Sequence, residues 1–282
     1  GSAAATGSAC QYHCGLDLPY WQRPQGLRQL LFLMHFSFLA FLRRLAARMV
    51  GYGIIAAAKL LTGVRSLWQT PAESAPTVYF ANHNSHADFA LVWATLPRPV
   101  RRITRPVAGA DYWLAKPLRR FVGVEVINAL MIAREGGRLR ENNPVRQMAA
   151  ALEEGSSLIM FPEGTRNMGD KPLQEIKSGI VHLAKAYPQA RFVPVWIDNV
   201  QRVLPKGILV PIPLACTVRY GAPLEFSADV NKKVFLDMVR DALLNLRPAH
   251  DRQGEPNPAA PQADAPMPAA PASAAPEASH AD

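Results

Sequence analysis

The chain has little cysteine, a long segment without acidic residues, and no uninterrupted apolar run of bilayer length. Its 282 residues include three cysteines, Cys10, Cys14 and Cys216. Three thiols exclude a disulfide framework, and the spacing of Cys10 and Cys14 has no second ligand pair nearby that would indicate zinc. We therefore expect a reducing, cytosolic environment and no bound metal.

The two ends of the chain differ from the rest. Residues 1–19 are typical of a tag, a linker or a flexible N-terminus. Residues 248–282 are mostly proline and alanine with almost no bulky apolar side chains, which predicts a disordered tail. This tail holds one of the 31 basic and five of the 22 acidic residues, so the other residues carry a net charge of +13. Such an excess predicts an anionic partner: nucleic acid, an anionic membrane or a phosphorylated substrate.

Residues 20–70 combine positive charge with two apolar runs. No aspartate or glutamate lies between Asp17 and Glu73, and the runs at 30–42 and 49–61 have 13 residues each. Because a helix needs roughly 20 apolar residues to span a bilayer, we predict a helical hairpin embedded in one leaflet, with its basic side chains reaching lipid phosphates. A hairpin buried against the domain and a single tilted span are the alternatives. Apolar runs between the cations fit a lipid partner better than nucleic acid, which we do not expect as a partner.

Residues 71–247 alternate short apolar strands with helices. This pattern predicts an α/β domain with a central, largely parallel or mixed sheet flanked by helices. Pro144 suits the first turn of one helix and Gly155 its end. The expected strands are 78–80, 103–108, 124–127, 130–133, 157–161, 192–197 and 214–220. The expected helices are 89–96, 112–121, 144–154, 178–186 and 231–246.

The first candidate site is NHNSHADF, residues 82–89, at a predicted strand-to-helix turn. Four residues separate His83 from Asp88, so the chain can fold back and the carboxylate can fix the imidazole tautomer, which leaves the other ring nitrogen as a general base. His86 is a poorer partner because a separation of two places the side chains on different helix faces. On spacing alone, a loop histidine without a catalytic role is an equal alternative. Ser85 lacks the G-x-S-x-G context of a serine hydrolase.

The second candidate site is FPEGTRN, residues 161–167, which also follows an apolar strand directly. Gly164 permits close approach of the backbone, Thr165 offers a hydroxyl, and Arg166 offers a guanidinium fork that suits a phosphate. In isolation, a capped turn with a solvated arginine is the alternative interpretation of such a heptad.

Taken together, His83-x4-Asp88 and FPEGTRN resemble the glycerolipid acyltransferase family, in its 1-acylglycerol-3-phosphate acyltransferase branch. The resemblance runs from about Thr77 to Tyr220 and is much more specific than either motif alone. A looser match to the family's second motif ends at Arg134, without the expected aromatic residue. The sequence Lys177-Ser178-Gly179 matches the family's basic helix start, and a helix pair in the membrane is similar to that of bacterial members.

The resemblance implies transfer of an acyl group from a coenzyme A or acyl carrier protein thioester to the hydroxyl of a lysophospholipid, without metal or other cofactor. His83 would remove the hydroxyl proton and Asp88 would stabilise the imidazolium. The implied substrate-binding residues for phosphate and glycerol are Glu163, Gly164, Thr165, Arg166, Arg134 and Lys177. Glu163 has two open roles, which are to bind the glycerol or to hold the arginine. The implied location is the cytoplasmic face of the inner membrane, with the protein bound to one leaflet.

Two kinds of alternative stay open at this point. One keeps the chemistry and changes the acceptor to another lysophospholipid, to glycerol-3-phosphate or to an amino-acid lipid. The other is a non-catalytic protein that binds the membrane surface through its basic segment. Intact His83 and Asp88 favour an enzyme, because a binding module needs neither.

Overall fold

The computed structural model describes residues 25–85, 87–133, 143–169, 171–198, 216–226 and 230–248. Of the residues discussed above, His86 and Arg134 lie outside the described ranges, as do both of the chain ends that were predicted to be flexible. The side chains of residues 25–34 and of Phe36 are likewise not described.

Seven strands form one sheet in the order β1-β7-β6-β2-β5-β3-β4. Every neighbouring pair is parallel except β6 and β7, which are antiparallel. The predicted α/β domain with a largely parallel sheet is therefore confirmed. Central strands β2 and β5 are buried along their whole length, as expected for strands covered on both faces. The strands are β1 (Arg65–Trp68), β2 (Thr77–Ala81), β3 (Thr104–Gly109), β4 (Leu130–Ile132), β5 (Ser157–Met160), β6 (Arg191–Asp198) and β7 (Thr217–Tyr220).

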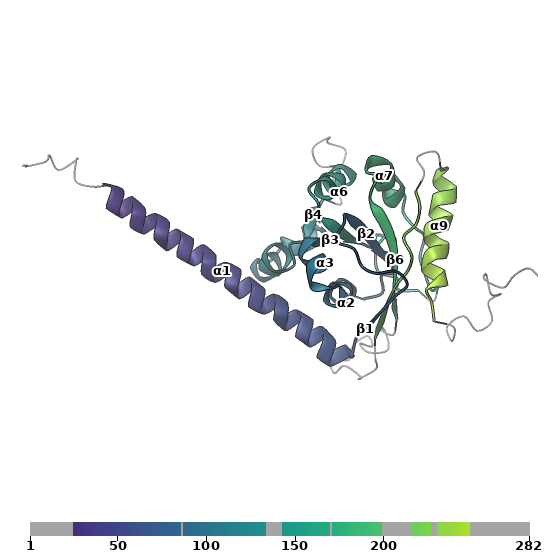
Figure 1. Cartoon of the computed structure of the whole chain (residues 1–282), viewed down its shortest axis with the longest axis horizontal. Coiled ribbons are helices and arrows are strands. Elements are labelled where there is room, and N and C mark those ends of the chain that lie inside the picture. Colours follow the sequence, from purple (N-terminus) through teal and green to yellow (C-terminus); the bar gives the residue numbers. More distant parts are fainter. Residues whose placement is uncertain are drawn as a thin grey trace, which may run out of the picture.

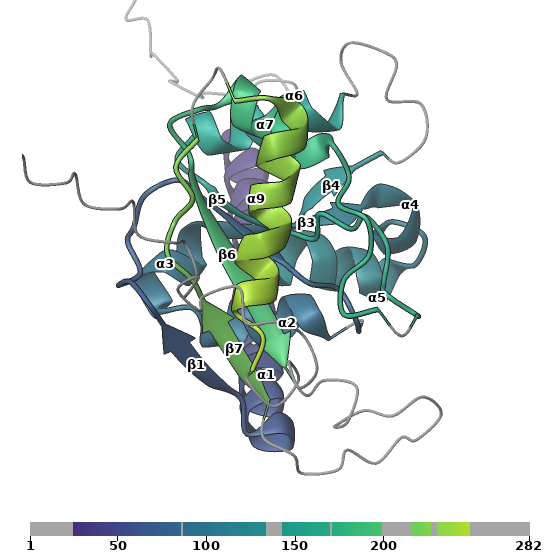
Figure 2. The same ribbon diagram turned by 90° about the vertical axis from the view of Figure 1, so that its right-hand side faces the viewer.

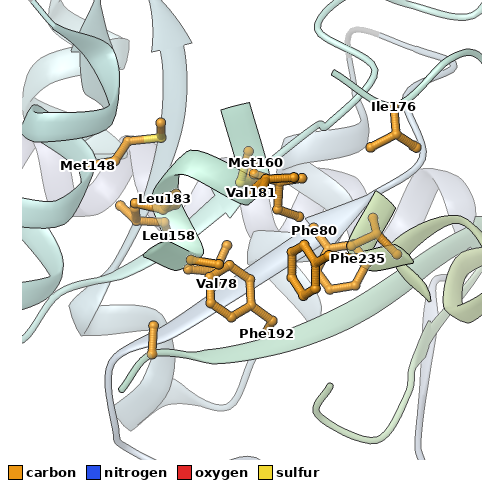
Figure 3. Close-up of a cluster of buried hydrophobic side chains, with 14 of the residues drawn as sticks. Val78, Phe80, Met148, Leu158, Met160, Ile176, Val181, Leu183, Phe192 and Phe235 are labelled. Carbon is orange, nitrogen blue, oxygen red and sulfur yellow. The ribbon is translucent and has the colours of Figure 1, made fainter. Parts of the chain in front are cut away.

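Helices cover both faces of the sheet (Figures 1 and 2). Side chains alternate along β2, so Val78 and Phe80 enter the cluster under α6, α7 and α9, where Phe192 and Phe235 also lie (Figure 3). Tyr79 points the other way, into the cluster that α2 covers. The helices of the domain are α2 (Asp88–Thr95), α3 (Arg98–Ile103), α4 (Ala110–Trp113), α5 (Pro117–Arg120), η2 (Phe121–Val126), α6 (Pro144–Glu153), α7 (Gly179–Ala186) and α9 (Lys232–Asn245).

The connection from β3 to β4 differs from the prediction of one helix over 112–121 and a strand over 124–127. It consists of α4, α5 and the wider-turned helix η2. Pro117 cannot continue a preceding helix, so it starts α5 instead. The backbone of Gly123 in η2 lies so close to its neighbours that an added Cβ would be 2.7 Å from Met131 Cε and 2.9 Å from Trp113 Cε3. This packing holds the segment beside the sheet as a helix.

The predicted membrane-associated pair of helices is wrong in one respect, because Gln25–Thr62 is a single continuous helix, α1. Arginines interrupt the apolar runs in the sequence, but arginine is a good helix former and no proline lies in this segment. The helix ends at Gly63, which has a φ of +54° and donates its N–H to the Lys59 carbonyl. Figure 1 shows that the N-terminal half of α1 extends away from the sheet.

The part of α1 from Ser37 to Thr62 is long and apolar enough to cross a membrane, by length and composition. It is also largely exposed, with 17% of its most apolar window buried. The C-terminal half of α1 packs on α2 and η2 (Figure 1). A long apolar helix with so little of its surface covered by the domain supports membrane association.

Candidate active site

Two loops meet at the carboxyl ends of β2 and β5, which are neighbouring parallel strands. The first, residues 82–87, leads from β2 into α2, and the second begins at Phe161 directly after β5. Asn82 anchors the first loop across the sheet. Its fully buried side-chain amide donates to the carbonyl of Ile197 at 3.1 Å and accepts from the N–H of the same residue at 2.8 Å. This pair of bonds fixes the residue immediately before His83.

His83 and Asp88 are in contact, as predicted, with 2.9 Å between His83 Nδ1 and Asp88 Oδ2. The Asp88 side chain is 1% exposed, and its Oδ2 also accepts the backbone N–H groups of Asn84 (2.6 Å) and Ser85 (2.7 Å). The loop therefore wraps around the carboxylate and fixes its position. The His83 side chain is 20% exposed. Since Asp88 engages Nδ1, Nε2 is the ring nitrogen left to exchange a proton with a substrate.

The ring of His83 also stacks on Phe161, with 4.2 Å between ring centroids and 17° between planes. Phe161 is the first residue of the second loop, so this contact sets the plane of the imidazole from the neighbouring strand. Phe161 was predicted as the start of a motif, but no pattern in the sequence indicated this contact.

Glu163 ties the two loops together. Its carboxylate accepts the N–H of His83 through Oε1 and the N–H of Gln174 through Oε2, both at 2.8 Å. The residue is 1% exposed. Burial raises its pKa, while the two backbone N–H groups lower it less. Neither predicted role, binding the glycerol or holding Arg166, describes this geometry, which makes Glu163 a residue that positions His83.

A second tie runs from the other end of the heptad. The backbone N–H of Asn167 donates to the carbonyl of His83 at 2.6 Å, so both backbone groups of His83 bond to the second loop. Asn167 is buried and its side chain donates to the carbonyl of Lys171 at 2.7 Å. Gln174 reaches toward the carbonyl of Arg166 at 3.4 Å. Asn167 and Gln174 therefore belong to the site's framework, although no pattern in the sequence indicated Gln174.

Arg166, one residue before Asn167, is half-buried, and its guanidinium makes no hydrogen bond or ion pair to the residues that the structure describes. Gly164 has a φ of +75°, the left-handed conformation that favours glycine. The Thr165 hydroxyl donates to the side chain of Gln174 at 3.3 Å and is exposed. Lys177 is exposed and lies 3.7 Å from the carboxylate of Glu175, a weak surface pair. Among the described residues, the guanidinium of Arg166 is therefore a cation of this loop that has no protein partner.

The described residues contain no group of three or more histidine, cysteine, aspartate or glutamate side chains placed to hold a metal ion. The site holds an oriented imidazole and a buried carboxylate, and the loop bonded to His83 bears the guanidinium of Arg166. Such a set can remove a proton from a hydroxyl and bind an anionic group.

Residues 64–198 match the model of a protein family described as Acyltransferase. A 1-acyl-sn-glycerol-3-phosphate acyltransferase of Limnanthes alba is 28% identical over 183 residues, covering 62% of this chain and 60% of the relative. An N-acylphosphatidylethanolamine synthase of Arabidopsis thaliana is 25% identical over 197 residues, covering 64% of this chain and 65% of the relative. The chain thus spans less than two thirds of the length of these relatives.

The fold is similar to the crystal structure of the 1-acyl-sn-glycerophosphate (LPA) acyltransferase PlsC from Thermotoga maritima. The TM-score is 0.53 at 18% identity, and the match covers 79% of this chain and 98% of that protein. At this identity the likeness concerns the fold. Together with the family match, it confirms the resemblance that His83-x4-Asp88 and FPEGTRN indicated.

Proposed function

We propose that the protein, whose residues 64–198 match the model of the Acyltransferase family, transfers a fatty acyl group from a thioester to the sn-2 hydroxyl of lysophosphatidic acid, which gives phosphatidic acid. The observation that carries the proposal is the double backbone tie between His83 and the second loop. The tie joins the backbone of His83 to that of Asn167, the residue after Arg166, whose guanidinium has no partner among the described residues. Lysophosphatidic acid carries its phosphate and its free hydroxyl on neighbouring carbons, so a base and a cation on two joined loops suit it.

In the proposed reaction, His83 Nε2 takes the proton of the acceptor hydroxyl while the oxygen attacks the thioester carbonyl. The tetrahedral intermediate collapses, the carbon–sulfur bond breaks and the leaving thiolate receives the proton from the imidazolium. Asp88 keeps Nδ1–H as a donor and stabilises the positive ring. The products are the ester and the free thiol, so neither ATP nor a cofactor is needed.

Arg166 would bind the acceptor phosphate, with Lys177 at the exposed rim and Thr165 and Gly164 shaping the loop. Arg134 keeps the same proposed role, on the resemblance alone. The acyl donor is an acyl thioester of coenzyme A or of acyl carrier protein. We further propose that α1 lies in one leaflet at the cytoplasmic face, because the arginine-bearing side of the helix faces the domain instead of a second apolar layer.

The proposal is tested with the full chain purified in detergent, given a labelled acyl thioester and a panel of acceptors. The panel contains lysophosphatidic acid, other lysophospholipids, glycerol-3-phosphate and phosphatidylethanolamine. We expect transfer to lysophosphatidic acid at the highest kcat/KM. Preferred acylation of phosphatidylethanolamine would instead assign the activity named for the Arabidopsis relative.

His83→Ala is expected to lower kcat by about a thousandfold or more, since it removes the base together with its orientation. His182→Ala is the matched control, because His182 is an exposed histidine on α7, on the far side of the sheet from α2. It should keep activity within about twofold. Transfer by His83→Ala at the wild-type rate would refute the base assignment, and no transfer by the wild type to any acceptor would favour a non-catalytic membrane-binding protein.

A further inference from the structure

A cavity of about 1050 Å³ lies between α1, α3 and η2. Thr104, the first residue of β3, lines it, whereas His83 follows the last residue of β2. Both strands run parallel to β5, so the cavity lies at the amino-terminal edge of the sheet and the proposed catalytic pair at the carboxyl edge. Its volume is at the upper end of the roughly 300–1000 Å³ that small ligands occupy. Six arginines line it, and we therefore call it the arginine cavity. They are Arg43, Arg44 and Arg48 of α1, and Arg98, Arg101 and Arg102 of α3.

The charges around the arginine cavity are not balanced. Glu125 is the sole carboxylate among its described lining residues, and Arg43 already engages it, with 2.6 Å between Nε and Oε2. Arg101 donates to two backbone carbonyls at the end of α2 and lies over the ring of Trp93. The four others make no hydrogen bond or ion pair with a described residue; they are Arg44, Arg48, Arg98 and Arg102.

The crowding of positive charge is seen at Arg101. Burial lowers the pKa of its guanidinium, the interaction with Tyr52 opposes this, and the positive charge of Arg98 acts in the same direction as burial. Four unpartnered guanidinium groups around one concavity repel each other, and an anion placed among them would offset that repulsion. Arginine is also the side chain whose planar fork best matches phosphate.

α1 presents different chemistry on two of its sides. Residues four, seven and eleven positions apart share one side of a helix. On the side facing the arginine cavity these positions are Arg44, Arg48, Gly51 and Ile55. About a third of a turn further round the helix, the same spacing gives Phe38, Leu42, Leu45 and Met49, which are 42 to 64% exposed.

This arrangement sets the depth of the arginine cavity at a membrane. If the apolar side of α1 enters the acyl layer, the arginines lie within one helix diameter of it, roughly 10 Å. That is the level of the lipid headgroups. Gly51 lies where α1 packs on the domain, and a Cβ there would make ordinary contacts, 3.4 Å from Val126 Cγ1 and 3.6 Å from Trp93 Cη2.

We propose that the arginine cavity binds the phosphate headgroup of an anionic membrane phospholipid, at a site separate from the proposed catalytic one, and that the bound lipid bridges α1 to α3. A lipid acceptor must reach His83 at the other edge of the sheet, so the lipid in this cavity is not the substrate. A carrier protein delivering a thioester would also have to dock near His83. Because α1 bears apolar residues beside its arginines, a membrane lipid fits the arginine cavity better than an acceptor substrate or a carrier protein does.

The test is calorimetric titration of the full chain in non-ionic detergent with a short-chain phosphatidylglycerol. Parallel titrations use phosphatidylcholine of the same chain length, inorganic phosphate and acyl carrier protein. The cavity variant is Arg48→Gln/Arg98→Gln/Arg102→Gln, which keeps the two arginines that bond within the protein. The matched control is Lys59→Gln/Lys116→Gln/Arg120→Gln, which removes three exposed cations of α1 and α5 that do not line the cavity.

We expect saturable binding of one phosphatidylglycerol per chain, weakened at least about tenfold in the cavity variant and less than about twofold in the control. The Arg→Lys version of the cavity variant should recover part of the affinity, which separates lost charge from lost structure. Equal weakening in both triple variants would overturn the proposal in favour of diffuse surface attraction. Inorganic phosphate binding as tightly as the lipid, or carrier protein binding through these arginines without lipid binding, would overturn it as well. Because the readout is binding, the result is independent of the proposed acyl transfer.

Discussion

The two edges of the sheet differ in how far their polar groups are already engaged within the protein. At the carboxyl edge His83 uses its N–H, its carbonyl and Nδ1 in bonds to Glu163, Asn167 and Asp88. At the amino-terminal edge, the four unpartnered arginines of the arginine cavity have no such bonds to the described residues. Bonded groups have fixed positions, while unbonded cations keep their capacity for an external anion.

This difference teaches which kinetic or binding quantity a substitution should change at each edge. Replacing an engaged group moves the catalytic atoms, so the loss should appear in kcat. Replacing an unengaged cation removes an attraction that exists only when the ligand is present, so the loss should appear in KM or in a dissociation constant. Arg166 lies at the carboxyl edge, but its guanidinium has no bond to a described residue, so its replacement should change KM although that of its neighbours should change kcat.

The largest effect is expected at the most engaged group. Asp88→Asn should lower kcat by about a thousandfold with KM little changed, because a neutral amide oxygen is a weaker acceptor for the three donors at Oδ2 and no longer stabilises the imidazolium of His83. Steady-state kinetics with lysophosphatidic acid measure this. Asp241→Asn, on the exposed side of α9, is the control. A loss below about tenfold would show that the engaged carboxylate does not govern the base.

Arg166→Ala should lower kcat/KM for lysophosphatidic acid by about 10- to 100-fold, mostly through KM, since a charge-assisted bond to phosphate is lost. The companion substrate is monoacylglycerol, which lacks the phosphate and should show little change. Arg146→Ala, an exposed arginine of α6, is the control variant. Equal losses with both acceptors would mean that Arg166 supports the loop and does not bind phosphate.

Gly164→Ala tests whether the second loop, which bonds to the backbone of His83, depends on the left-handed conformation of Gly164. The substitution should lower the free energy of unfolding by about 1 kcal/mol, because an L-residue at a φ of +75° is strained. Space is not the cause, since the added Cβ would lie 3.5 Å from Lys177 Cγ, an ordinary contact. Gly179→Ala, at the first residue of α7 with nothing within 4 Å, should be neutral or stabilising. Chemical denaturation of both variants compares them, and the same sign of change in each would contradict the backbone argument.

The sequence could predict those parts of the site that are close in the chain. His83 and Asp88 are five residues apart, and the turn between them is set by local bonds to Asn84 and Ser85, so their spacing alone indicated the contact. The alternating apolar strands likewise predicted the parallel sheet. Glu163 was found as a motif residue, but its bond to the His83 N–H depends on how two strands 80 residues apart are paired.

What could not be predicted depends on contacts between distant segments. Gln174 reaches Glu163 only because a long loop returns to its own start. The arginine cavity exists because α1 packs on α2 and η2, which places its arginines across a cavity from those of α3, and each arginine taken singly fits a solvated surface. The break predicted within α1 was wrong for a related reason, because charge interrupted the apolar runs but nothing in the segment reversed the chain direction. The wide helix η2 was missed because its form depends on Trp113 and Met131 packing against Gly123.

The smallest expected effect is a pH dependence of the free energy of unfolding that comes from the Glu163 carboxyl. Burial raises the folded-state pKa of Glu163 above its ordinary value of 4.5, and the two backbone N–H groups oppose this only in part. Protonation therefore favours the folded state, so this carboxyl contributes stability that is fully present below pH 4.5 and is lost as the pH rises through the folded-state pKa. Glu163→Gln lacks this contribution.

The measured quantity is the free energy of unfolding of the wild type minus that of Glu163→Gln, from urea denaturation at a series of pH values. This difference should fall as the pH rises from below 4.5 and then become constant. The variant should also carry a pH-independent loss of about 1–3 kcal/mol, because a glutamine amide leaves one of the two backbone N–H donors without an acceptor. A difference that rises with pH would mean that the N–H groups of His83 and Gln174 outweigh burial. In that case the engaged edge would be stabilised by its buried charge, and the tie between the two loops would be strongest in the ionised state, in which His83 would act as a base.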